Sequence, residues 1–123
     1  MDFSKNNYIE SELGKISKVK KKNISYNLTY SSPTTFLYPK NYNEVKKIIS
    51  YLNKSKKKIL IKTGSCGHGD KANLQESEFA ISLSRLKRII KFDKKKETVT
   101  AQSGIRIEEL FYYLKKRNYT ICN

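Results

Sequence analysis

The residues that could do chemistry gather in one short stretch, residues 59–70, which reads ILIKTGSCGHGD. An apolar run ends at Lys62, and three glycines then fall within six residues. Among them stand the only histidine of the chain and one of its two cysteines. The residues concerned are Gly64, Ser65, Cys66, Gly67, His68, Gly69 and Asp70. A metal ion, a nucleophilic pair of side chains and a phosphate group are the three uses to compare.

Metal binding and nucleophilic catalysis both fit this stretch poorly. A zinc site needs three or four ligands with tetrahedral reach, and the supply is limited to Cys66, His68, Asp70 and Cys122, with no CxxC or HxxxH spacing. A Cys/His pair needs a third group to orient it. Cys66 and His68 lie two positions apart on a glycine-rich loop, where their directions are poorly fixed. We therefore expect no metal site, and from these residues alone the catalytic residues remain unknown.

Phosphate binding suits the glycines better. Glycine lets backbone N–H groups approach an anion closely and turn inward around it as a concave nest. The loop is not a P-loop, because no GKS or GKT follows. It is not a dinucleotide-binding fingerprint either, because GxGxxG is not matched and no helix clearly begins after Asp70. On spacing alone, an anion-binding loop and a plain tight loop both remain open.

Regular elements surround this loop. Apolar residues at helical spacing predict a helix over 43–54, capped by Asn41 or Asn43. The loop follows a buried strand at 58–62 and precedes a second strand at 79–83. Alternation predicts a hairpin of strands 86–92 and 98–102 around a charged turn at 93–97. A helix over 106–117 and a strand beginning at 118–122 complete an α+β order.

The first part of the chain has weaker signals. We interpret residues 1–38 as an N-terminal extension that is partly strand. It holds a basic block at 18–22 and a possible strand at 24–30. Ser and Pro at 31–33 predict a break between elements. Residues 39–123 then form the main domain.

Composition sets outer limits on function. The 123 residues suffice for one small domain, and the formal net charge is +15. Nearly all the basic residues are lysines spread along the chain, as codon bias in an AT-rich genome produces, although a phosphate-rich ligand or an anionic surface would also explain them. No run approaches the length of a membrane span. The N-terminus lacks the apolar core of a secretory signal, and two distant cysteines suit a reducing compartment, so we expect a cytoplasmic protein.

Residues 39–123 resemble the start of the FAD-binding PCMH-type domain of the vanillyl-alcohol oxidase/p-cresol methylhydroxylase superfamily. The family opens with a Pro before a helix that carries Glu-Val, as Pro39 and Glu44-Val45 do here. A strand then feeds a glycine loop, followed by a segment of the form "isL..L..I..fd....tVtvqaG" and a helix with "..eL...L...gy". The matching residues are Ile81–Leu83, Leu86, Ile89, Phe92-Asp93, Thr98–Gly104, Glu109-Leu110, Leu114 and Asn118-Tyr119.

The nearest branch resembles sugar-lactone oxidases and decaprenylphosphoryl-ribose oxidases. Their GRSYGD loop aligns without a gap on residues 65–70, with Gly69 and Asp70 identical, while Thr63 and Ser65 fill glycine positions of the family. The resemblance implies that backbone amides around residues 64–70 hold the FAD pyrophosphate non-covalently. In another register Gly67-His68 matches the Gly-His of GxGHS, which would allow a covalent flavin on His68.

The resemblance also implies what the chain lacks. Family members continue into a "PG…TVGG…HG" segment and a substrate domain, and this sequence ends at Asn123 before both. We expect a truncated gene product, half of a split enzyme completed by a second polypeptide, or an incomplete chain, and in each case little activity alone. The implied function is FAD binding within an oxidoreductase that acts on a sugar or sugar-derived alcohol. The alternative is a basic α+β module that binds nucleic acid or an anionic surface without redox activity.

Overall fold

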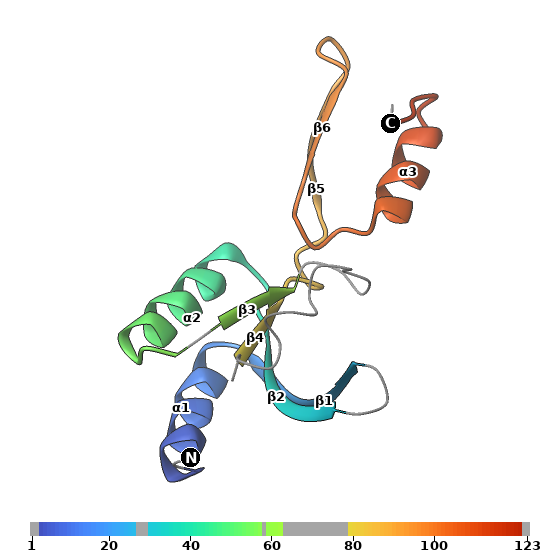
Figure 1. Ribbon diagram of the computed structural model, residues 1–123. Coiled ribbons are helices and arrows are strands. Elements are labelled where there is room, and N and C mark those ends of the chain that lie inside the picture. The colour runs from blue at the N-terminus through green and yellow to red at the C-terminus, as the bar shows by residue number, and fades with distance from the viewer. Residues whose placement is uncertain (1–2, 27–29, 58, 63–78, 122–123) are drawn as a thin grey trace.

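The computed structural model describes residues 3–26, 30–57, 59–62 and 79–121 (Figure 1). They form two sheets, one of four strands in the order β1-β2-β4-β3 and one of two strands, β5-β6. The elements in chain order are α1 Phe3–Ile16, β1 Lys18–Tyr26, β2 Tyr30–Tyr38, α2 Tyr42–Lys54, β3 Ile59–Lys62, β4 Phe79–Ser82, β5 Ile89–Asp93, β6 Thr98–Ala101 and α3 Ile107–Lys115.

The four-stranded sheet is mixed. β1 and β2 form an antiparallel hairpin, and β2 continues beside β4 in a parallel pairing. β3 lies on the other side of β4, also parallel, so that three strands run in one direction. The predicted α+β class, with a mixed sheet and flanking helices, is confirmed.

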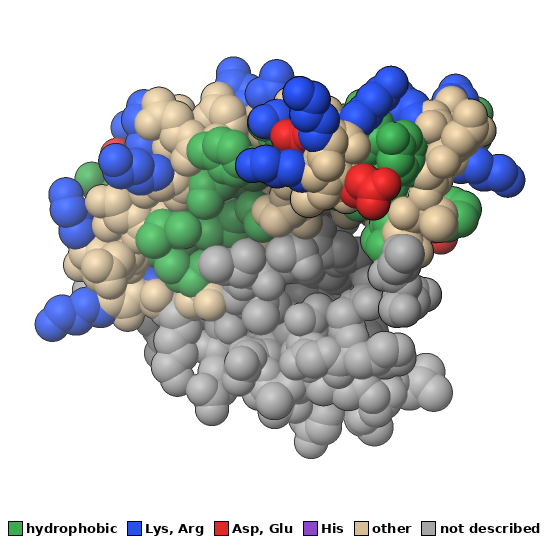
Figure 2. Space-filling model, turned by 90° about the horizontal axis from the view of Figure 1, so that it is seen from above, with side chains coloured by type: hydrophobic (Ala, Val, Ile, Leu, Met, Phe, Trp, Pro, Cys, Tyr) green, Lys and Arg blue, Asp and Glu red, His purple; other side chains and the backbone are tan. Residues whose placement is uncertain are grey.

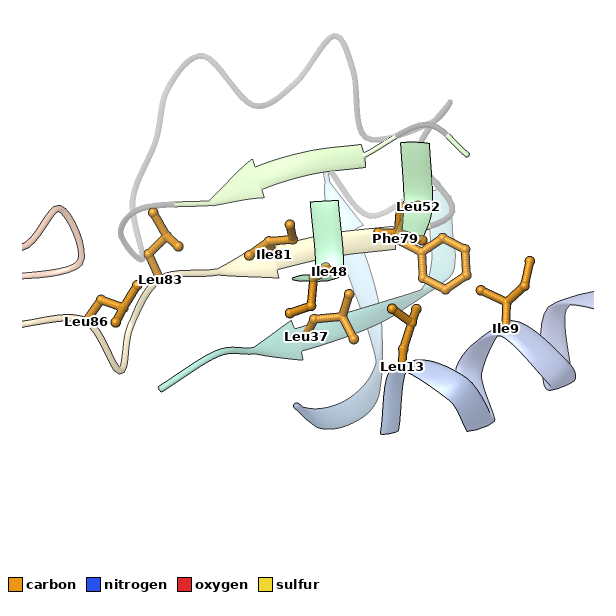
Figure 3. Packing of buried hydrophobic residues seen from close by; sticks show 9 residues of the cluster. All are labelled: Ile9, Leu13, Leu37, Ile48, Leu52, Phe79, Ile81, Leu83 and Leu86. Carbon is orange, nitrogen blue, oxygen red and sulfur yellow. The ribbon is translucent and has the colours of Figure 1, made fainter. Parts of the chain in front are cut away.

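One face of this sheet forms the core with α1 and α2 (Figure 3). Both helices contribute apolar side chains to the same buried cluster, so they lie on the same face. Residue alternation along β4 brings Phe79 and Ile81 to this face. The cluster consists of Ile9, Leu13, Leu37, Ile48, Leu52, Phe79, Ile81, Leu83 and Leu86.

Helix α2 begins where its sequence predicts. The Asn41 side chain accepts a hydrogen bond from the Glu44 N–H at 2.8 Å, and the Glu44 carboxylate accepts one from the Lys40 N–H at 2.9 Å. The first bond satisfies a backbone donor that the first turn leaves free, and the second ties the Glu44 side chain to the residue before the N-cap. Ile48 and Leu52, one turn apart, are fully buried. The predicted helix over 43–54 is thus confirmed, and it packs into the core beside β4, with Ile59 of β3 at its margin.

The β5–β6 hairpin and α3 form a second unit, drawn at the top of Figure 1. The Asp93 carboxylate accepts hydrogen bonds from the Lys95 and Lys96 N–H groups, which closes the predicted turn. The Phe92 ring meets the Tyr113 and Tyr119 rings edge-on, with centroids 6.3 and 5.0 Å away. The predicted hairpin is confirmed, but β5 begins at residue 89 and not at 86, because residues 83–88 form a connection with a turn at residues 84–85.

The N-terminal predictions need correction. Residues 3–16 form helix α1, which the sequence did not suggest, and the basic block at 18–22 lies in strand β1. The strand predicted at 24–30 is right only in part: residues 24–26 are the end of β1 and Tyr30 is the start of β2, while residues 27–29 lie outside the described residues. Residues 31–33, predicted to form a break between elements, lie inside β2. Pro33 is tolerated there because β2 pairs with β4 only over residues 35–37.

A side-chain bridge attaches α1 to the hairpin and explains why this polar segment docks. The Glu10 carboxylate accepts a hydrogen bond from the buried Thr35 hydroxyl at 2.7 Å and pairs with Lys21 at 3.0 Å. Thr35 and Lys21 are partners in the β1–β2 register, so both reach the same helix. Ile9 and Leu13 supply the apolar part of the contact.

The strand predicted at 118–122 is absent over residues 118–121, the part that the structure describes. Asn118 takes a positive φ of 61°, and the Tyr119 N–H returns to the Leu114 carbonyl at 3.1 Å. These bonds end α3 and direct the Tyr119 ring onto Phe92.

We expect two adjacent isoleucines of α2 to differ sharply in their contribution to stability. Ile48 is 0% exposed and Ile49 is 38% exposed. Ile48→Ala should cost about 2–4 kcal/mol of unfolding free energy, and Ile49→Ala less than about 1 kcal/mol, because only the former leaves a cavity. Urea denaturation followed by circular dichroism measures both. Equal costs would contradict this packing of α2.

Candidate functional site

The site residues predicted from sequence, 64–70, lie outside the described residues, but the structure fixes where the loop departs. β3 ends at Lys62, which lies beside Ser82 of β4 in the parallel register. On the other side of β4, Leu37 lies beside Ile81, so Tyr38 reaches the same level. The loop therefore leaves the carboxyl edge of three parallel strands, the edge at which open α/β sheets bind ligands.

A set of hydrogen bonds, which we call the clasp, holds the end of β4 against the end of β6. It comprises Leu86 N–H to Leu83 O, Gly104 N–H to Leu86 O and Gln102 N–H to Arg88 O, each 2.8 Å, and Arg88 N–H to the Gln102 side-chain oxygen at 2.9 Å. Gln102 is only 3% exposed. A buried, satisfied amide is costly to displace, so the clasp fixes where the hairpin leaves the carboxyl edge.

Gly104 makes the clasp possible by close approach of two backbones. A Cβ on this residue would stand 1.7 Å from the Leu83 carbonyl oxygen and 2.8 Å from that of Leu86. No side chain fits there, and both obstructing atoms belong to backbone. The sequence signal was Ser103-Gly104 after a strand, which on its own reads as an ordinary turn.

Charge at the carboxyl edge is unevenly placed. The first turn of α2 contains Glu44, and that of α3 contains Glu108 and Glu109. These carboxylates complement the partial positive charge of the helix N-termini. A cation stands nearby: the Arg85 guanidinium donates to the Tyr38 carbonyl at 3.0 Å. On the face that Figure 2 shows, other Lys and Arg side chains are scattered and do not gather in one patch.

The groups with shifted pKa values lie on α1 and near the C-terminal end of α2. Burial raises the pKa of the Tyr51 phenol near the end of α2, and the hydrogen bond to Glu12 raises the pKa of the Lys15 ammonium on α1. Within the described residues, no three His, Cys, Asp or Glu side chains converge as a metal ion would require. No described helix is both long and apolar enough to cross a bilayer.

The fold is that of PCMH-type flavoenzymes. A variant of Physcomitrella patens BBE-like 1 superposes with a TM-score of 0.73 at 15% identity, over 89% of this chain and 26% of that one. p-Cresol methylhydroxylase superposes with a TM-score of 0.62 at 18% identity, over 89% of this chain and 21% of that one. At these identities the likeness establishes the fold alone.

Sequence comparison supplies the family. Residues 33–123 match the family described as FAD binding domain, and the chain belongs to this family. The match includes β3, β4, the clasp and α3, together with the predicted glycine loop. The predicted resemblance is thereby confirmed, and FAD binding is favoured over a basic module without a redox role.

Two curated relatives point to one class of oxidase. L-gulonolactone oxidase of Scyliorhinus torazame is 29% identical over 83 residues, 67% of this chain and 18% of that protein. L-gulonolactone oxidase of Mus musculus is 26% identical over 92 residues, 75% of this chain and 20% of that protein. The chain thus spans about one fifth of the length of these relatives.

Two glycine substitutions should change stability in opposite directions. Gly104→Ala should cost about 3 kcal/mol, because the new methyl group overlaps backbone at the clasp. Gly14→Ala, within α1 and with nothing within 4 Å of its added Cβ, should stabilise by about 0.5–1 kcal/mol. Chemical denaturation of both variants and the parent tests the pair. A neutral Gly104→Ala would disprove the close approach.

Proposed function

We propose that this chain binds FAD at the carboxyl edge of β2, β4 and β3, as part of an oxidoreductase that oxidises a sugar or sugar-derived alcohol. The observation that carries the proposal is the family match over 33–123, which contains this edge and its loop. The substrate class rests on the curated relatives, whose names give L-gulonolactone as the compound oxidised.

The residues at the edge fit the cofactor. A diphosphate needs hydrogen-bond donors and positive charge in a place that a ligand can reach. The described edge ends three strands together and carries an exposed arginine. The loop adds seven residues with three glycines, starting two positions after the end of β3. In this proposal the backbone amides of Gly64–Asp70 hold the pyrophosphate as a nest.

Bound FAD supplies hydride acceptance from a carbon that bears the hydroxyl group. The residues of this chain bind and orient the cofactor, and we assign none of them to proton transfer. We place His68 beside the flavin without a covalent bond. The other register, which puts a covalent link on His68, differs in one measurable respect, namely whether the flavin remains on the denatured polypeptide.

The loop proposal predicts unequal effects of two neighbouring substitutions. Gly67→Val adds a branched side chain where backbone must approach phosphate, and should weaken FAD binding about tenfold or more, as expected for about 1–3 kcal/mol of strain. His68→Ala should change it less than about threefold, because a flanking ring adds only modest contact energy. Titration of each variant with FAD, followed by flavin fluorescence, measures both.

Gly14→Val is the matched control, since it makes the same change on an exposed turn of α1 away from the edge. It should leave FAD affinity unchanged. Retention of FAD by Gly67→Val together with its loss in His68→Ala would refute the nest. Flavin that stays on the parent polypeptide after acid precipitation, but not on His68→Ala, would establish the histidyl link.

A further inference from the structure

We propose that Arg85 is a phosphate-binding residue of this edge, its guanidinium pairing with the diphosphate of the cofactor. The inference rests on the proposed function and extends it to a residue outside the glycine loop. It starts from the one hydrogen bond that the Arg85 side chain makes within the described residues, to the carbonyl of Tyr38.

That bond fixes the position of a cation that would otherwise be mobile. Arg85 lies in the turn after β4, and its Nη1 reaches back to the last residue of β2 at 3.0 Å. The guanidinium therefore stands at the carboxyl edge, on the opposite side of β4 from β3. Since adjacent strands lie about 4.8 Å apart, the ends of β2 and β3 are roughly 10 Å apart. A diphosphate lying over the end of β4, between these two ends, is close enough to the guanidinium to accept its hydrogen bonds.

The helix N-termini, where proteins often bind phosphate, are already occupied by carboxylates. At α2 the Glu44 carboxylate accepts the Lys40 N–H at 2.9 Å and pairs with the Lys40 ammonium at 3.8 Å. At α3 two glutamates occupy the first turn. A diphosphate placed at either helix would face a carboxylate of the same sign. The positive ends of the helix dipoles near this edge are thus already complemented by side-chain carboxylates of the protein.

The other cationic side chains near this turn differ from Arg85 in the partners that they have. The Lys87 ammonium pairs with Glu109 at 3.4 Å. Arg88 is exposed, and its backbone, not its side chain, takes part in the clasp. Arg85 has no carboxylate partner among the described residues, so its charge is not neutralised by that part of the protein. A guanidinium keeps its charge at all working pH values, and its fork of donors matches two phosphate oxygens.

The test is to bind three probes to four forms of the chain. The probes are FAD, inorganic pyrophosphate and riboflavin, which lacks phosphate; the forms are the parent chain, Arg85→Met, Arg85→Lys and Arg88→Met. Arg88→Met is the matched control, because it removes the same charge from the same turn. Isothermal titration calorimetry gives each dissociation constant, and thermal unfolding shows that each variant is folded.

We expect Arg85→Met to weaken FAD and pyrophosphate binding about tenfold to thirtyfold, as charge-assisted hydrogen bonds do when lost. Arg85→Lys keeps the charge but not the fork, and should weaken both about threefold to tenfold. Riboflavin affinity should stay the same in every form, and Arg88→Met should change all three affinities less than about twofold. If Arg85→Met does not fold, the FAD and pyrophosphate affinities of Arg85→Lys decide whether Arg85 binds phosphate.

The outcomes separate this inference from the proposed function. A parent chain that binds neither FAD nor pyrophosphate overturns both. A parent chain that binds FAD, while Arg85→Met behaves like Arg88→Met, overturns the role of Arg85 and leaves the proposed function standing. Equal loss of riboflavin and pyrophosphate would show that Arg85 supports the edge without contacting phosphate.

Discussion

The burial of β4 is the constraint on which the rest of the structure depends. All four of its residues are buried, and it has a parallel neighbour on each side. Parallel strands are usually buried, because helices cover the faces of their sheet. Helices α1 and α2 cover one face through a single apolar cluster. The parallel direction of the three strands also brings their carboxyl ends, and hence the departing loop, to one edge.

The clasp joins the carboxyl edge of the four-stranded sheet to the β5–β6 hairpin. It ties the turn after β4 to the end of β6 through backbone groups and one buried amide. The position of Arg85 depends on it, since that residue lies within the clasped turn. Binding groups from the sheet and from the turn are thereby held in a fixed relation. Preorganised groups of this kind need less ordering when a ligand arrives.

What the sequence predicted well shares one physical property, namely strong local signals. Helix α2 has an asparagine N-cap and an apolar stripe, and the β5–β6 hairpin has alternation around a charged turn. The strands on either side of the glycine loop were also found, because short apolar runs bounded by turn residues are typical of buried strands.

The first 38 residues were predicted poorly because their signals are not local. In α1 the buried residues Ile9 and Leu13 are surrounded by polar ones, and docking depends on Glu10 reaching a distant strand. β1 is an edge strand rich in lysine, which suits an exposed edge but has low strand propensity. The clasp escaped prediction for the same reason. Gly104 appears as a turn residue until Leu83 is brought against it in three dimensions.

The strand order has a consequence for how the chain folds during synthesis. β3 leaves the ribosome before β4, yet its only partner among the described strands is β4, which inserts between β3 and β2. Until residue 82 has emerged, the apolar face of α2 and the open side of β2 have no β4 to pack against. Such unpaired edges are where nascent chains aggregate. A pause in synthesis after β3 has emerged and before β4 has emerged would therefore hold the protein at its most vulnerable stage.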